Sequence, residues 1–269
     1  MGEVSPSPIA TSFRPRNTAT QWSGPGGWDN QENEWVGNIH VTPDLPQVEM
    51  AIVELTNAFR QENRLSALKR NRTLDEAARS FAKYLARTGK FAHTADGRRP
   101  ADRTRAAGYT HCQISENLAL NVDSRGFTTR KLAEAAIEGW KNSPPHRKAM
   151  VAPHVTEIGV GVAKAAEEQR YLSVQLFGRP QALQYQFTIR NMANREVGYT
   201  HTGEHHALAG RTEVQHTECT PANLRFDEIG AARQPAKKPA EFPTRDGDLF
   251  VVHNNKSGQL VVEHRPRVD

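Results

Sequence analysis

The stretch that decides the fold is GWKNSPPHR, residues 139–147. It closes a helical pattern that begins at Thr129, because its two prolines cannot continue the hydrogen-bond ladder of a helix. The apolar stripe of this helix consists of Leu132, Ala136 and Trp140. We therefore expect a helix that stops at residues 143–145 and leaves His146 directly behind the stop.

Two more amphipathic helices are expected upstream of that stretch. The apolar stripe of the first, at spacings of three and four, consists of Val48, Ile52, Leu55 and Phe59. The second opens at Thr73 in a pattern typical of a capping box, in which the Thr73 hydroxyl takes the backbone N–H of Glu76 and Glu76 reaches back. Gly89 is expected to end this second helix.

Alternation with a period of two predicts strands between and after the helices. Residues 115–121 form one short strand pattern, and residues 158–162 and 171–177 flank a polar turn, which indicates a β-hairpin. Helices and strands in this order favour an α+β domain over residues 46–180, with a sheet sandwiched by helices.

The two ends of the chain carry different patterns. Residues 1–45 are rich in Ser, Pro, Gly and Asn without apolar periodicity, which predicts a disordered or loosely docked arm. The aromatic residues that favour docking of this arm are Trp22, Trp28 and Trp35. Short strand patterns separated by turns predict a small all-β module over residues 183–269.

Composition excludes some classes of function. The formal charge is +5, from 35 basic and 30 acidic residues spread along the chain, so nucleic acid is not an expected partner. No apolar stretch approaches the roughly 20 residues that cross a bilayer, and the N-terminus lacks the apolar core of a secretory signal. Cys112 and Cys219 are too few for a disulfide scaffold. They either pair or stay free, and free thiols are the interpretation favoured here.

Four local patterns of the first domain occur together in order. They are FAHT (residues 91–94), SENLA (115–119), GWKNSPPHR (139–147) and EIGVG (157–161). In this order and spacing they resemble the CAP superfamily, the cysteine-rich secretory, antigen 5 and pathogenesis-related proteins, and most closely its bacterial SCP-like branch. The resemblance covers about residues 47–178. It implies an α-β-α sandwich with a central groove, in a secreted or cell-envelope protein.

The resemblance also implies which residues line the groove. His93 matches the first groove histidine, Glu116 the glutamate of the Glu-Asn-Leu strand, and His146 the second histidine. Animal members usually place a second glutamate where this chain has Ser143, and Glu138, one turn upstream, is the residue that could partly replace it. The expected groove is therefore lined by His93, Glu116, Ser143 and His146.

Two chemical interpretations of these side chains stay open. Two imidazoles and a carboxylate suit a divalent metal, Zn²⁺ or Mg²⁺, with positions left for a water of lowered pKa. Alternatively, His93, Glu116 and His146 hydrogen-bond one another and Ser143 and tie helices to the sheet without a cofactor. A nucleophilic pair of Cys112 with His93 or His111 is conceivable, but nothing at Cys112 matches a nucleophile of the family.

Two functions follow from these interpretations. The favoured one is binding of a lipid, a peptide or a cell-envelope component in the groove, because the sequence has no recognisable nucleophile and its tetrad is incomplete. The alternative is a metal-dependent, peptidase-like hydrolase that uses His93, Glu116 and His146. In the second module, clustered histidines are interpreted as surface residues rather than a second metal site; they are His201, His205 and His206.

Overall fold

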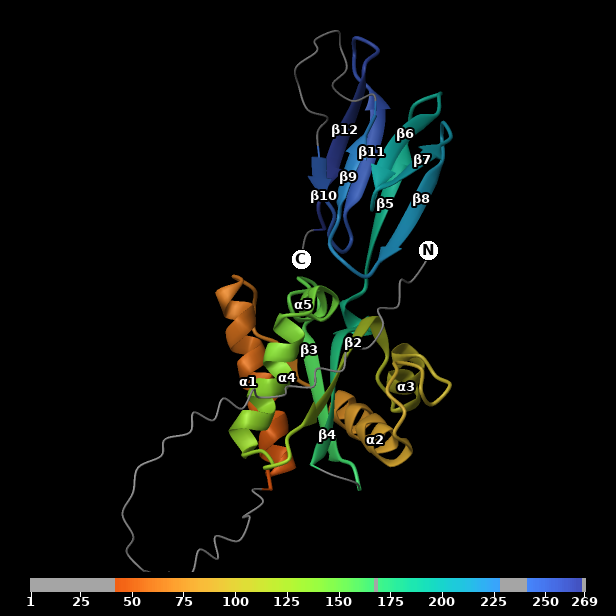
Figure 1. Ribbon diagram of the computed structural model, residues 1–269. Helices are drawn as coiled ribbons and strands as arrows, with labels where there is room; N and C mark the ends of the chain where they lie inside the picture. Colours follow the sequence, from red (N-terminus) through yellow and green to blue (C-terminus); the bar gives the residue numbers. More distant parts are fainter. Residues whose placement is uncertain (1–41, 167–168, 228–240, 268–269) are drawn as a thin grey trace, which may run out of the picture. The chain divides into compact units, whose positions relative to one another are not determined.

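The computed structural model describes residues 42–166, 169–227 and 241–267 (Figure 1). The expected N-terminal arm with its three tryptophans lies almost wholly outside the described residues. The chain divides into two compact units between Gly178 and Arg179.

The N-terminal unit is built on one four-stranded sheet with the strand order β1-β3-β4-β2. Its strands are β1 (Lys69–Arg70), β2 (His111–Val122), β3 (Glu157–Lys164) and β4 (Arg170–Pro180). Strands β3 and β4 pair antiparallel with Ile158 opposite Phe177, so the predicted hairpin is confirmed. The short strand predicted at residues 115–121 is the C-terminal part of β2.

Helices cover both faces of this sheet (Figure 1). One side carries α1 (Leu45–Glu62) and α4 (Thr129–Lys141), followed by α5 (Pro144–Met150), and the other carries α2 (Arg72–Thr88) and α3 (Pro100–Ala106). Each side has its own hydrophobic core, with Trp140 in the first and Phe81 in the second. The unit is therefore the α-β-α sandwich that the resemblance implied.

The two helix layers pack against β3 at different distances, because its side chains differ in size on the two faces. Ile158 and Val160 point into the core under α1 and α4. A side chain at Gly159 would lie 2.3 Å from the carbonyl carbon of Leu74, and one at Gly161 would lie 2.1 Å from the backbone nitrogen of Arg79. Helix α2 therefore packs with its backbone directly on β3, which only glycine permits.

Helix α2 is capped at its first end by a residue other than the predicted one, and it ends at the predicted residue. The N-cap of α2 is Asn71, whose side chain accepts the backbone N–H groups of Thr73 and Leu74, so the capping box predicted at Thr73 is wrong. Asparagine is an equally good N-cap, and it lies two residues earlier. At the other end Gly89 closes α2 in the left-handed conformation with φ of 67°, as predicted.

The prolines that stop α4 also begin a helix that the sequence analysis missed. Helix α4 ends at Lys141, and α5 starts at Pro144 with Ser143 as its N-cap. Proline suits the first turn of a helix because the backbone N–H groups there have no partner within the helix. His146 therefore lies on α5 rather than in a loop.

The C-terminal unit is all β, with two four-stranded sheets in the orders β10-β9-β6-β7 and β12-β11-β5-β8. The predicted all-β character of residues 183–269 is therefore confirmed. The strands are β5 (Tyr185–Asn191), β6 (Val197–His201), β7 (Glu204–Leu208), β8 (Glu213–Glu218), β9 (Asn223–Phe226), β10 (Glu241–Pro243), β11 (Leu249–Asn254) and β12 (Leu260–Arg265), with a short 3-10 helix, η1 (Gln181–Leu183), before β5. Aromatic residues of both sheets share one core, among them Phe187, Phe226 and Phe250.

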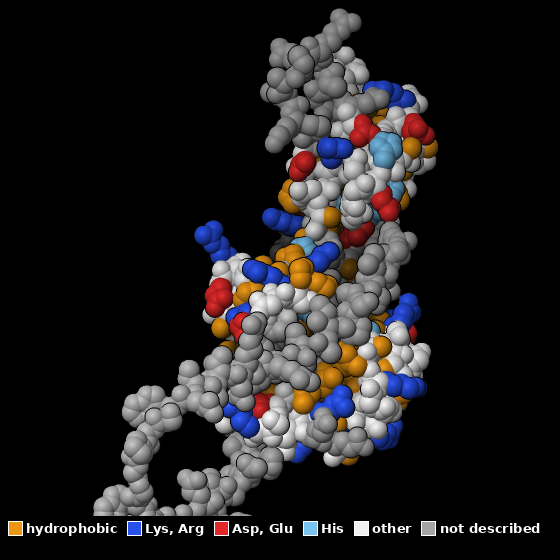
Figure 2. All heavy atoms as spheres, viewed as in Figure 1, with side chains coloured by type: hydrophobic (Ala, Val, Ile, Leu, Met, Phe, Trp, Pro, Cys, Tyr) orange, Lys and Arg blue, Asp and Glu red, His pale blue; other side chains and the backbone are white. Residues whose placement is uncertain are grey.

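The two units differ in the side chains that they expose. On the face shown in Figure 2, hydrophobic side chains gather on the N-terminal unit, whereas acidic, basic and histidine side chains mix on the C-terminal one. In the described part of the chain, no helix is long and apolar enough to cross a membrane.

Candidate functional site

Glu116 lies in the middle of β2 with its side chain only 1% exposed. Both of its carboxylate oxygens are engaged: Oε1 lies 2.9 Å from His93 Nδ1, and Oε2 accepts a hydrogen bond of 2.7 Å from Arg103 Nη2. A carboxylate can only accept, so His93 Nδ1 carries the proton in this pair. The buried charge of Glu116 is therefore balanced by Arg103 and oriented by His93.

Arg103 is the site residue that sequence reasoning missed. It comes from α3, its guanidinium carbon lies 3.5 Å from the centre of the Phe81 ring, and its side chain is 8% exposed. Its Nη1 donates to the His93 carbonyl at 2.9 Å, the Asp96 carboxylate at 2.9 Å and the Arg98 carbonyl at 2.7 Å. A single arginine thus fixes the loop that carries His93 and neutralises Glu116.

No local signal distinguishes Arg103 in the sequence. Arg105 lies two positions away on the same helix and is 63% exposed, whereas Arg103 is buried. The difference depends on which side of α3 packs against β2 and α2, and periodicity over a seven-residue helix does not reveal that.

His146 approaches the same place from α5 and is 5% exposed. Its backbone carbonyl accepts a hydrogen bond of 3.1 Å from Asn117 Nδ2, and Asn117 also donates to Gln175 Oε1 at 3.2 Å. Burial lowers the pKa of His146, and the nearby His93 lowers it further. His146 is therefore held next to His93 as a neutral ring at neutral pH.

Ser143 and Glu138 are the two residues that the sequence offered as a fourth polar group beside His93, Glu116 and His146. The Ser143 hydroxyl is buried and has no hydrogen-bond partner among the described residues. Glu138 is 63% exposed and lies 3.6 Å from Lys141 Nζ. Ser143 thus takes no part in a hydrogen-bonded hub here, and the ion pair of Glu138 is with its own helix.

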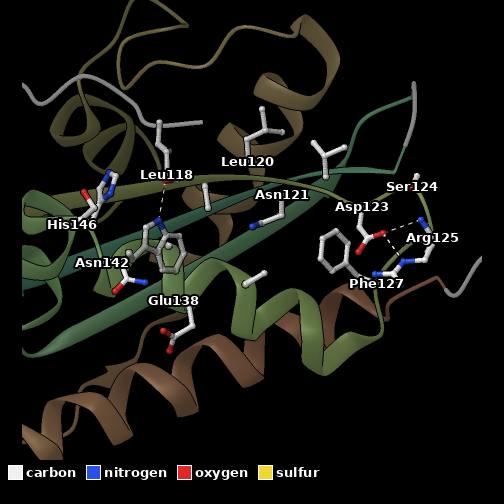
Figure 3. A pocket seen from close by; sticks show the side chains of 16 residues that line it. Leu118, Leu120, Asn121, Asp123, Ser124, Arg125, Phe127, Glu138, Asn142 and His146 are labelled. Carbon is white, nitrogen blue, oxygen red and sulfur yellow. Dashed lines mark hydrogen bonds and ion pairs between the residues drawn. The ribbon is translucent and has the colours of Figure 1, made fainter. Parts of the chain in front are cut away.

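A groove opens beside His146 and Ser143, between β2 and α4 (Figure 3). Its volume is about 820 Å³. The apolar part of its lining consists of Leu118, Leu120, Val122, Phe127, Ala135 and Trp140. In Figure 3, His146 and Asn142 lie toward one end and Asp123 and Arg125 toward the other. The groove therefore combines an apolar wall with polar groups at both ends.

The cysteines exclude one kind of chemistry. Cys112 and Cys219 are both disulfide-bonded, so the prediction of free thiols is wrong. A cysteine nucleophile must be a thiolate. Cys112 in its disulfide form therefore cannot pair with His93 or His111 as a nucleophile.

The potential metal ligands of the described residues gather elsewhere. Three side chains whose ligand atoms all lie within 4.8 Å of one another are His201, His216 and Glu218, in the C-terminal unit. This group contains none of the predicted ligands His93, Glu116 and His146. His201 is 2% exposed, so its interpretation as a surface histidine is wrong, whereas the His205 side chain is 64% exposed.

The N-terminal unit matches a known family. The model of the cysteine-rich secretory protein family, CAP, matches residues 53–177 and ends at the boundary between the units. YkwD of Bacillus subtilis is 31% identical over 118 residues, 44% of this chain and 43% of YkwD. The membrane protein YlbC of the same species is 30% identical over 126 residues, 46% of this chain and 34% of YlbC. The match thus spans less than half the length of either relative.

A solved structure resembles about half of the chain. An outer surface protein from Borrelia burgdorferi is 22% identical, with a TM-score of 0.46, and the match covers 51% of this chain and 96% of that one.

Proposed function

Residues 53–177 are a CAP domain of the cysteine-rich secretory protein family, and from that premise we propose that the protein binds an amphipathic ligand of the lipid class in the groove between β2 and α4. The apolar part of the ligand lies along the wall formed by these two elements, and its polar end lies at His146 and Ser143. His93 and Glu116 hold that end of the groove in shape.

The state of Glu116 is the observation that carries this proposal. A carboxylate that serves as a metal ligand or a general base needs a free lone pair, and at Glu116 one oxygen already faces His93 and the other accepts from Arg103. A metal ion there would compete with the charged, buried hydrogen bond that Arg103 donates to Glu116. This supports binding over the alternative of a metal-dependent hydrolase at His93, Glu116 and His146.

The lining of the groove supports the choice of ligand. Each methylene group transferred from water to an apolar wall contributes about 0.8 kcal/mol. The lining includes the charged residues Asp123, Arg125 and Glu138, but its apolar stretch with Leu120 and Val122 suits an acyl chain. At the polar end, the unpartnered hydroxyl of Ser143 and the neutral ring of His146 supply hydrogen-bonding groups for a head group.

The state of the cysteines supports a location outside the cytoplasm. Disulfides persist in oxidising compartments and are rare where thiols are kept reduced. The disulfide-bonded Cys112 and Cys219 therefore favour a secreted or cell-envelope protein. The matched family bears the name of secretory proteins, which points the same way.

A pair of matched variants tests the proposed binding. Val122 on β2 lines the groove and is 43% exposed, and Met50 on α1 is 48% exposed but does not line it. Affinity for a fluorescent long-chain fatty acid is measured for the wild type, Val122→Asp and Met50→Asp. We expect Val122→Asp to weaken binding about tenfold or more, which is about 1.4 kcal/mol or more, and Met50→Asp to leave it unchanged.

The same titration can refute the proposal. No saturable binding to the wild type, or equal loss in both variants, would contradict a lipid site in this groove. Fatty-acid binding that needs added zinc and disappears in His93→Ala would instead support the metal-dependent alternative.

A further inference from the structure

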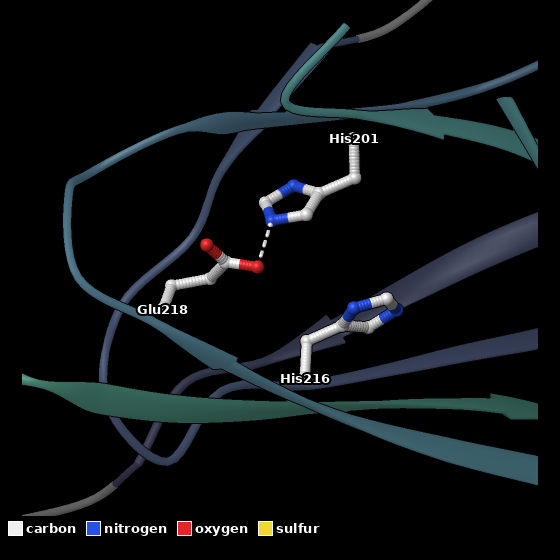
Figure 4. Close-up of side chains that lie close together, drawn as sticks. All are labelled: His201, His216 and Glu218. Atoms are coloured by element: carbon white, nitrogen blue, oxygen red, sulfur yellow. Dashed lines mark ion pairs between the residues drawn. The ribbon is translucent and has the colours of Figure 1, made fainter. Parts of the chain in front are cut away.

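The C-terminal unit brings two histidines and a glutamate together from opposite sheets. His201 is the last residue of β6, in one sheet, and His216 and Glu218 lie on β8, in the other. Because side chains alternate along a strand, residues 216 and 218 point to the same side of β8. Figure 4 shows all three side chains converging between the strands.

His201 is held there without the hydrogen bonds that a buried imidazole needs. It is 2% exposed, and neither of its ring nitrogens has a hydrogen-bond partner among the described residues. Its Nε2 lies at ion-pair distance from Glu218 Oε1, 2.9 Å, but the two groups are not aligned for a hydrogen bond. A buried polar group without a hydrogen bond is costly, and a ligand bound at this ring would relieve that cost.

His216 is oriented for such a ligand by its neighbours. Its Nε2 lies 2.8 Å from the Tyr199 hydroxyl, and its ring stacks on Phe187 at 5.0 Å between ring centres. The Tyr199 hydroxyl can accept the Nε2 proton, which leaves Nδ1 with a free lone pair. This is how histidines that bind metals are usually held, with the second nitrogen in a hydrogen bond that fixes the tautomer.

We propose that His201, His216 and Glu218 form a binding site for a divalent transition-metal ion, with Zn²⁺ as the best match, that links the two sheets of the C-terminal unit. Two imidazole nitrogens and one carboxylate oxygen are the ligands that zinc prefers, whereas Mg²⁺ and Ca²⁺ prefer an all-oxygen set. Nothing in the groove of the CAP domain enters this assignment.

The geometry requires only a small adjustment. Tetrahedral zinc with ligands at about 2.0–2.1 Å places its ligand atoms about 3.4 Å apart. The three ligand atoms here lie within 4.8 Å of one another, and the pair of His201 and Glu218 is already at 2.9 Å. The Glu218 side chain is 22% exposed, so it can turn toward the ion while a water takes the fourth position.

Glu218 is a better metal ligand than Glu116 because of its partner. Among the described residues, Glu116 is paired with an arginine, whereas the ion pair of Glu218 is with His201, itself one of the three ligands. A metal ion would replace that pair by binding both partners and would satisfy the nitrogen and the oxygen at once.

The test measures zinc binding by the full chain, purified without a histidine tag and stripped with a chelator. Titration against a chromophoric zinc indicator gives the stoichiometry and affinity, and Co²⁺ gives a visible spectrum that reports tetrahedral coordination. We expect one Zn²⁺ per chain in the wild type, and a loss of binding in His216→Ala and in Glu218→Gln. The isosteric Glu218→Gln keeps the fold testable if His216→Ala does not fold, and its far-UV circular dichroism checks this.

Two further variants separate this site from others. His205→Ala changes an exposed histidine that pairs with Asp227, and it should bind zinc like the wild type. Tyr199→Phe removes the partner of His216 Nε2 and should weaken zinc binding by about 10–100-fold without abolishing it.

Three results would overturn the proposal. One is a wild type that binds no zinc, which would leave His201 and Glu218 as a buried ion pair. Another is zinc affinity that is unchanged in a folded Glu218→Gln. The third is zinc lost in His93→Ala but kept in Glu218→Gln, which would place the ion in the groove of the CAP domain.

Discussion

The two units of this protein each pair a glutamate with a histidine, but the two glutamates differ in burial and in their other partners. In the CAP domain, Glu116 meets His93 and also Arg103, so its charge is balanced by a permanent cation. In the β unit, Glu218 meets His201, whose charge depends on a proton. A guanidinium keeps its proton at every accessible pH, and an imidazole does not. We therefore expect a metal ion to meet more competition at Glu116 than at Glu218.

Among the changes that test this difference, replacing Arg103 should have the largest effect on stability. Arg103→Met keeps an apolar side chain over Phe81 but leaves Glu116 as a buried charge without its cation. Breaking a buried pair on one side costs about 3–5 kcal/mol, so we expect the CAP domain to lose about that much stability. Hydrogen exchange of the backbone amides of β2 and α2 measures it. Arg105→Met on the same helix is the control and should change stability by less than about 1 kcal/mol.

The same variant tests whether Arg103 causes the difference between the two units in metal binding. If Arg103 is what closes the CAP groove to metals, a folded Arg103→Met should gain zinc binding that disappears on adding His93→Ala. A folded Arg103→Met that gains no zinc binding would show that the distance between the groove ligands, rather than the arginine, separates the two units.

Zinc should stabilise one unit and not the other. A ligand at about 100 times its dissociation constant stabilises the state that binds it by about 2.7 kcal/mol. We therefore expect zinc to slow amide exchange in β6 and β8 of the wild type but not of Glu218→Gln, and to leave β2 unchanged. Equal protection of β2 and β8 would contradict the assignment of the metal to the β unit.

Acidification should lower the free energy of unfolding of both units, through His146 in the CAP domain and His216 in the β unit. Burial lowers the pKa of His146 and of His216 below the ordinary value of 6.5, and nearby histidines add to it. The unfolded chain then binds more protons than the folded one below about pH 6.5, so stability falls as the pH falls from that value toward the folded pKa. One proton changes stability by at most about 1.4 kcal/mol per pH unit.

Single substitutions assign this slope to its residue. We expect His146→Gln to flatten the pH dependence of the CAP domain and His216→Gln that of the β unit, each measured by urea unfolding between pH 5 and 8. A slope that stays unchanged in both variants would mean that other groups carry it. The metal-free protein is used, because bound zinc would add its own pH dependence.

The smallest effect is expected at the outer face of the β unit. His205 pairs with Asp227 at 2.5 Å, but the two side chains are 64% and 33% exposed. Pairs of that kind contribute about 0–1 kcal/mol, so His205→Ala should hardly change the melting temperature. A large loss would show that exposure is a poor guide to which histidines matter in this unit.

The sequence predicted the helices and strands more accurately than the residues at which they begin and end. The stripe of Leu132, Ala136 and Trp140 and the hairpin of β3 and β4 follow from periodicity, which a strand or helix shows over its whole length. The capping box at Thr73 was wrong because several residues near a helix start can cap it, and only the backbone decides between them. Helix α5 was missed because Pro144 can end one helix and begin the next.

By itself the sequence determined the layers of the CAP domain, the all-β character of the second unit and the family motifs around His93, Glu116 and His146. Only the tertiary structure decided what the charged groups in them do. Burial turned Arg103 into the partner of Glu116, and it turned His201, predicted to be a surface residue, into a buried ring paired with Glu218. The physical reason is that local periodicity depends on neighbours along the chain. Charge balance and desolvation depend instead on groups that meet from separate elements, such as α3 with β2 and β6 with β8.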